Sequence, residues 1–237
     1  MTHVLLHGRS LLLLDFDGLI CDTERAAYRS WELTYAEHGH TFSPRLWRQM
    51  AGLSTGEEVA AADLGRRLGR SLTQDDFLAR RARKSALCDE EPLRPGVADL
   101  LIEARAMSLK VAVVSSSPRS WVHHHLVRLH VFDSFDLLMT GGNGIRPKPT
   151  PDLYLRALRV LDRTADDALA VEDSAVGVQA ARAAGLDCVG VPNAVGARQS
   201  WGNPPWCWKR WSSCWTPLRA WADTLAPEPN WNMQPQP

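Results

Sequence analysis

Short apolar runs alternate with helix-like segments along most of the chain. The runs that predict buried strands are 10–14, 110–114, 135–140, 168–171 and 188–191. Between them, apolar residues recur at the spacing of amphipathic helices in 97–107, 120–129, 151–161 and 175–184. Strands and helices that alternate through short connections form parallel sheets covered on both faces. The pattern therefore predicts an α/β fold, a Rossmann-like parallel sheet with helices on both faces.

The segment from residue 23 to residue 89 interrupts this alternation. It is rich in Ala, Leu, Arg and Glu, it lacks β-branched runs, and its apolar residues have helical spacing. We therefore expect a small all-helical cap domain here. The core is then discontinuous, with residues 1–22 and 90–199.

The tail, residues 200–237, has an unusual composition. Seven of the ten tryptophans lie between Trp201 and Trp231, among Pro, Cys and Arg and without a clear period. Such a segment is not expected to be an ordered element. With GC-rich codons, residues 206–217 read two bases later would encode an amphipathic helix. We hypothesise that the tail is a frameshifted read of an ordinary C-terminus; a Trp-rich binding segment is the alternative.

Charge, hydropathy and cysteine content exclude several classes of partner. Basic and acidic residues both number 27, so no net charge attracts nucleic acid or an anionic membrane. No apolar run approaches the roughly 20 residues of a membrane helix. The five cysteines are odd in number and have no Cys-x-x-Cys spacing, which disfavours disulfides and zinc. We expect a cytoplasmic protein, a monomer or weak homodimer, without nucleic-acid or membrane partners.

Two carboxylates directly follow the first predicted strand, in the run Asp15-Phe16-Asp17-Gly18. A divalent cation can bind one carboxylate while the other stays free to transfer protons. An Asp-Gly turn that caps a helix explains an isolated pair of this kind at least as well.

Three further loops carry groups suited to phosphoryl transfer. Glu172 and Asp173 follow a predicted strand, although a helix cap would explain one of these acids. Ser115 and Ser116 follow another strand and could bind a phosphoryl oxygen. Lys148 lies between two prolines and could neutralise the same group, or be an ordinary surface lysine. Their joint occurrence at one sheet edge makes coincidence a poor explanation.

These segments resemble the four ordered motifs of the haloacid dehalogenase-like superfamily, in its phosphatase and β-phosphoglucomutase-like branch. The similarity extends over roughly residues 11–193, and the motif residues are Asp15 to Glu24, Ser115, Lys148 to Asp152 and Glu172 to Gly177.

The resemblance implies a role for each of these groups. Asp15 would attack phosphorus, and Asp17 would protonate the leaving group and then activate water. Mg²⁺ would be held by Asp15, the backbone carbonyl of Asp17 and Asp173, with support from Glu172. The phosphoryl group of a small phosphorylated metabolite, a sugar phosphate above all, would be bound by Ser115, Ser116 and Lys148.

Three residues help to choose among the activities of this family. The dehalogenase branch lacks the second aspartate, so Asp17 favours phosphoryl transfer. By local alignment, Ala27 and Thr55 occupy the positions where the mutase branch carries His and Arg. A phosphatase is therefore the first expectation and a β-phosphoglucomutase-like mutase the second. A non-catalytic binding protein is disfavoured because all the motif residues are present.

Two other features of the sequence are candidate functional sites. The cap loop that contains Gly52, Leu53, Ser54 and Thr55 is expected to screen substrates, with a plain interhelix turn as an equal alternative. The run His123-His124-His125 is expected to be a solvated helix face, because consecutive helical residues point about 100° apart.

Overall fold

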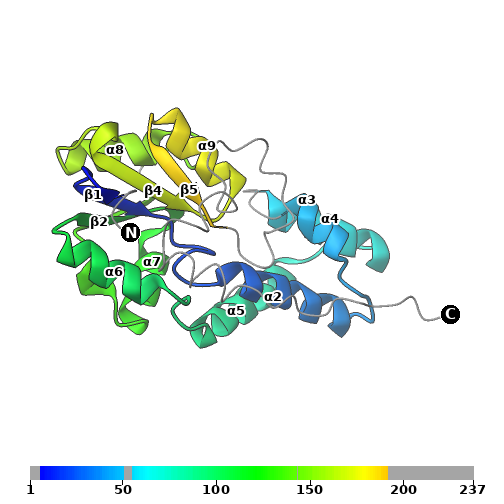
Figure 1. The fold of residues 1–237 in the computed structure, drawn as a ribbon. Helices are drawn as coiled ribbons and strands as arrows, with labels where there is room; N and C mark the ends of the chain where they lie inside the picture. Colours follow the sequence, from blue (N-terminus) through cyan, green and yellow to red (C-terminus); the bar gives the residue numbers. More distant parts are fainter. Residues whose placement is uncertain (1–5, 51–54, 143, 192–237) are drawn as a thin grey trace.

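The computed structural model describes residues 6–50, 55–142 and 144–191. Five parallel strands form one sheet in the order β3-β2-β1-β4-β5. The strands are β1 (Leu11–Leu14), β2 (Lys110–Pro118), β3 (Leu137–Gly141), β4 (Ala168–Glu172) and β5 (Asp187–Gly190). The central position of β1 brings it between β2 and β4 (Figure 1). The predicted fold class is confirmed.

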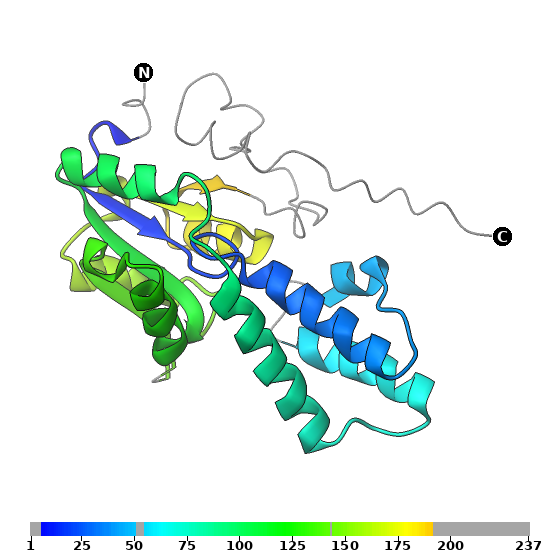
Figure 2. The same ribbon diagram turned by 90° about the horizontal axis from the view of Figure 1, so that it is seen from below.

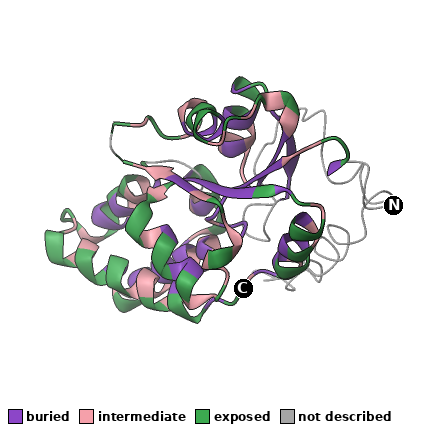
Figure 3. Ribbon diagram, turned by 90° about the vertical axis from the view of Figure 1, so that its left-hand side faces the viewer, coloured by how far each residue is buried: buried purple, intermediate pink, exposed green. Residues whose placement is uncertain are grey.

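Helices cover both faces of this sheet (Figure 1). One face packs against α6 (Val97–Ala106) and α7 (Arg119–Arg128), and the other against α8 (Asp152–Val160) and α9 (Ala175–Ala183). All four residues of β1 are buried, because alternate leucines enter the two apolar cores. Figure 3 shows the buried strands between helices whose outer surfaces are exposed.

Four further described helices form the helical insertion, which extends from one end of the sheet (Figure 2). They are α2 (Thr23–Glu37), α3 (Pro44–Met50), α4 (Gly56–Leu68) and α5 (Gln74–Glu90). The insertion has its own aromatic core around Trp31, Tyr35, Phe42 and Trp47. These helices occupy the range predicted for the cap, and its division from the core stays a prediction.

Strand β2 is longer than the sequence pattern predicts. It was expected to end at Val114, yet pairing with β3 continues to Pro118 through an irregularity after Ser115. Gly141 permits this close approach, because a Cβ there would overlap the backbone carbonyl of Ser116. The serine run therefore lies on a bulged strand end rather than in a free loop.

Other sequence predictions concern membrane spans, cysteines and the tail. No helix in the described part of the chain has the length and apolar character to cross a membrane. The cysteines placed within it, Cys21, Cys88 and Cys188, are buried free thiols. The tail from residue 200, and the end of the predicted core after residue 191, lie outside the described residues.

Candidate active site

Asp15 lies at the carboxyl end of the central strand. Its backbone N–H donates to the carbonyl of Val171 at 3.0 Å, so the sheet pairing with β4 continues through this residue. The residue is 7% exposed. The loops after β1, β2 and β4 end at this edge of the sheet, as expected for a site in a parallel α/β fold.

Lys148 contacts both Asp15, which follows β1, and Glu172, which ends β4. Its Nζ donates to Asp15 Oδ1 at 2.6 Å and to the carbonyl of Val114 at 2.6 Å, and it lies 2.6 Å from Glu172 Oε1. Burial alone would lower the pKa of this ammonium group, but the two carboxylates raise it above its usual value. The lysine therefore stays charged in the site, unlike a solvated surface residue.

Asp15, Glu172 and Asp173 form a buried acidic cluster whose ligand atoms all lie within 4.8 Å of one another. Burial, opposed by Lys148, raises the pKa of Asp15 to about 8. Burial and the nearby Asp15 charge raise the pKa of Asp173 well above its usual value. Glu172 Oε2 is buried without a hydrogen-bond partner among the described residues. A divalent cation fits this donor set, because carboxylate oxygens are the ligands that Mg²⁺ prefers.

Glu172 is held in place by residues on two helices. The hydroxyl of Tyr154 on α8 donates to Glu172 Oε1. Gly177 on α9 leaves room for the carboxylate, because a Cβ at this position would overlap both of its oxygens. Ser174 begins α9 by accepting the backbone N–H of Gly177 at 3.1 Å. The expected helix cap is therefore present, and it exists beside the two acids rather than instead of them.

Asp17 accepts hydrogen bonds from four side chains. Its Oδ1 accepts from Thr23 Oγ1 and Trp121 Nε1, each at 3.0 Å. Its Oδ2 accepts from Ser115 Oγ at 3.2 Å and Ser117 Oγ at 2.6 Å. The second aspartate thus lies against the end of β2 and the first turn of α7.

The serine run makes hydrogen bonds with both Asp17 and Lys148. Ser115 and Ser117, two residues apart on a strand end, reach the same carboxylate oxygen of Asp17. Ser116 Oγ accepts the backbone N–H of Lys148 at 3.1 Å and so holds the lysine loop. The roles of Ser115 and Ser116 as phosphoryl ligands stay predictions.

Two groups of contacts, which meet at the adjacent residues Ser115 and Ser116, join most of the residues chosen from sequence. Together they contain Asp15, Asp17, Ser115, Ser116, Lys148, Glu172 and Asp173. Thr55 is exposed at the start of α4, while Gly52, Leu53 and Ser54 lie outside the described residues. Sequence reasoning considered Ser117 only as part of the serine run that could bind a phosphoryl oxygen, and it missed Trp121 and Tyr154. Those two residues lie on helices and carried no signal in the sequence.

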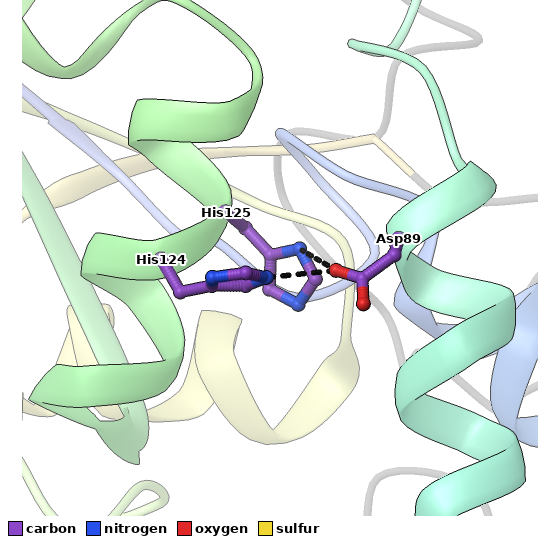
Figure 4. A group of neighbouring side chains, drawn as sticks. All are labelled: Asp89, His124 and His125. Carbon is purple, nitrogen blue, oxygen red and sulfur yellow. Dashed lines mark hydrogen bonds and ion pairs between the residues drawn. The ribbon is translucent and has the colours of Figure 1, made fainter.

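The histidine run is only in part the solvated face that the sequence predicts, because His123 and His124 are exposed and His125 is not. His125 is fully buried, and its ring meets Trp121 with centroids 4.3 Å apart. His124 Nε2 lies 2.8 Å from Asp89 Oδ1 on α5 (Figure 4). Arg128 Nε donates to His125 Nδ1 at 3.3 Å and lies 3.9 Å from Asp89 Oδ1, so a guanidinium is already the neighbour of both atoms. We interpret this group as an ion-pair contact between α5 and α7.

Comparisons with known proteins agree with this geometry. A family model described as a haloacid dehalogenase-like hydrolase matches residues 10–185. YhcW of Bacillus subtilis (strain 168) is 37% identical over 185 residues, covering 78% of this chain and 84% of YhcW. A phosphorylated carbohydrates phosphatase of Thermotoga maritima is 25% identical over 176 residues, covering 74% of this chain and 82% of the relative.

The fold is also similar to that of a solved structure. The crystal structure of mutant CbbY from Rhodobacter sphaeroides in complex with xylulose-(1,5)bisphosphate has a TM-score of 0.65 and 27% identity. It covers 84% of this chain and 93% of that chain. The protein belongs to the haloacid dehalogenase-like hydrolases, as its sequence motifs predicted, and it is an enzyme.

Proposed function

We propose that this enzyme is a Mg²⁺-dependent phosphatase that hydrolyses a small sugar phosphate. The observation that carries the proposal is the set of contacts near Asp15, in which a second aspartate, Ser115, a buried lysine and an acidic cluster come from the carboxyl ends of four strands or the segments that follow them. Phosphoryl transfer needs these groups together: a nucleophile, a proton donor, and cations to offset the charge of the phosphoryl oxygens.

Asp15 is the nucleophile in this mechanism. A carboxylate oxygen of Asp15 forms a bond to phosphorus as the bond to the sugar oxygen breaks, and Asp17 gives its proton to that oxygen. Asp17 then takes a proton from water, which attacks phosphorus and releases phosphate from Asp15. Lys148 offsets the repulsion between the aspartate and the phosphoryl oxygens.

Mg²⁺ would be held by Asp15, Asp173 and the backbone carbonyl of Asp17, with Glu172 supporting them. When bound, it would neutralise negative charge on the phosphoryl group. Activity is expected to require Mg²⁺ and to disappear with a chelator, and full turnover in chelator would contradict the metal assignment. Ca²⁺ should inhibit, because it takes more oxygen ligands than Mg²⁺ and would engage both oxygens of the nucleophile.

The sugar phosphate class is supported by the names of the relatives, which include a phosphorylated carbohydrates phosphatase. Transfer to water is favoured over mutase chemistry because Ala27 packs in the apolar core of the insertion. A methyl group in that place cannot handle protons as the mutase histidine does. The loop with Gly52, Leu53, Ser54 and Thr55 is proposed to choose the sugar.

Two substitutions test the roles of the aspartates. Asp15→Asn should lose essentially all turnover, because the amide is not a nucleophile. Asp17→Asn should lose turnover of sugar phosphates but keep a burst of nitrophenol from nitrophenyl phosphate, whose leaving group needs no proton. Rapid-quench and stopped-flow kinetics measure both. Equal and small losses in the two variants would show that the motif is structural.

A further inference from the structure

The four donors to Asp17 differ in what else they can bind. The hydroxyl of Ser115 is the proposed phosphoryl ligand, so substrate would draw it away from Asp17 Oδ2. The indole of Trp121 has a single N–H, accepts nothing, and is directed at Oδ1 at 3.0 Å. Its hydrogen bond to the carboxylate therefore persists when the phosphoryl group is bound.

Contacts from the sheet domain and from the helical insertion fix the indole of Trp121. On its own helix α7, the ring of His125 meets it at a centroid distance of 4.3 Å and an interplanar angle of 75°. From α5 of the insertion, Lys84 Nζ lies 5.4 Å from the ring centroid, within the range of a cation–π contact. The contact between His124 Nε2 and Asp89 Oδ1 at 2.8 Å holds the same two helices together (Figure 4).

The two donors to Oδ1 influence which carboxyl oxygen of Asp17 carries the acidic proton. A carboxyl oxygen that accepts from Trp121 and Thr23 is the poorer place for a proton, since those donors would face another hydrogen. Ser117 Oγ also reaches Oδ2, at 2.6 Å, but a hydroxyl can rotate its hydrogen away and accept, whereas the indole N–H can only donate. Once Ser115 turns to the phosphoryl group, Oδ2 is therefore the oxygen that can carry the proton toward the leaving group.

We propose that Trp121 is a positioning residue for Asp17, whose indole N–H holds Oδ1 so that the proton is carried on Oδ2 and aimed at the leaving-group oxygen. The step rests on the proposed function, in which Asp17 is the acid. The Oδ2–H bond breaks as the sugar oxygen gains the proton and loses its bond to phosphorus.

Trp121→Phe tests this role, because it removes the N–H and keeps an aromatic ring. Single-turnover phosphoryl transfer from a sugar phosphate should slow about tenfold with KM unchanged, the size expected for one hydrogen bond to a charged group. The nitrophenol burst should stay within about twofold. Trp47→Phe is the matched control, because Trp47 Nε1 is buried with no hydrogen-bond partner among the described residues.

A spectroscopic measurement covers the case in which the Trp121 variant does not fold. In ¹⁵N-labelled protein, Asp17→Ala should shift the indole resonance of Trp121 and leave that of Trp47 in place. An unmoved Trp121 resonance would overturn the proposal. Three results with Trp121→Phe would also overturn the proposal. They are unchanged or faster transfer from the sugar phosphate, an equal loss of the nitrophenol burst, and a rise in KM alone. Loss of the leaving-group dependence in Asp17→Asn would instead overturn the proposed function.

Discussion

The missing Cβ of one glycine makes room for the acidic cluster. Glu172 is fully buried, and its carboxylate lies where a side chain at position 177 would begin. Lys148 and Tyr154 hold one oxygen of this carboxylate, and the other faces the protein interior without a described partner. A buried carboxylate with an unsatisfied oxygen costs stability, and a site of this kind is retained for what it binds.

Gly177→Ala should disrupt the cluster by moving Glu172. We expect the affinity for Mg²⁺ to fall about 10-fold or more, the usual effect of disturbing a supporting group, and the free energy of unfolding to fall by roughly 1–3 kcal/mol from overpacking. Calorimetric titration and chemical denaturation measure the two. Adding Glu172→Asp should restore stability, because the shorter side chain vacates the space. Gly177→Ala with unchanged metal affinity would contradict this account.

At the scale of elements, α7 connects the sheet, the site and the insertion. Its buried His125 stacks on Phe16 with ring centroids 6.0 Å apart and accepts a hydrogen bond from Arg128 at Nδ1. An arginine can only donate, so the neutral ring carries its proton on Nε2, which has no partner among the described residues. Burial, with Arg128 and His124 nearby, lowers the pKa of His125 to about 4.

His125 should make the protein less stable in acid. Between its ordinary pKa of 6.5 and about 4, the unfolded chain binds a proton that the folded protein refuses, so stability is lost as pH falls through this window. His125→Leu should flatten the pH dependence of the free energy of unfolding between pH 6.5 and 4. His123→Leu, at an exposed position, is the control. Equal pH profiles for wild type and His125→Leu would refute the idea.

Elements with a local signal were predictable from the sequence, and contacts between elements were not. The strands β1 and β4 are buried on both faces, so their continuous apolar runs located them within a residue or two. The end of β2 was misplaced, because its last residues are polar and pair with β3 only through a bulge. The residues of the motifs came together because parallel strands share one carboxyl edge. Trp121 and His125 were missed because their roles depend on how α7 packs.

At the scale of the whole molecule, the number of protons that the folded protein binds should depend on the cation it is proposed to bind. Without metal, the folded protein holds a proton on Asp15 up to a pKa of about 8, against 3.8 in an unfolded chain. A carboxyl pKa raised by folding means that the folded state binds more protons than the unfolded state in this window. The contribution of Asp15 to stability therefore falls as pH rises from about 4 to 8 in metal-free protein.

Mg²⁺ should remove that loss and displace the protons. We expect the rise in melting temperature on adding Mg²⁺ to be larger at pH 8 than at pH 5, and protons to be released on binding at pH 7. Scanning calorimetry measures the first. Titrations in buffers with different enthalpies of ionisation measure the second. Asp15→Asn should release fewer protons, and release that does not depend on Asp15 would contradict the assignment.

The chain enters and leaves the insertion at neighbouring points. Cys21, just before α2, forms an antiparallel bridge with Leu93, just after α5, and Arg25 pairs with Glu91 across the same two crossings. Residues paired in this way have Cα atoms only about 5 Å apart, a gap that a tight turn can span. We therefore expect that the helices between these two points can be replaced by another insertion while the strands keep their register. If the insertion selects the sugar, as proposed, such a replacement should change the substrate preference.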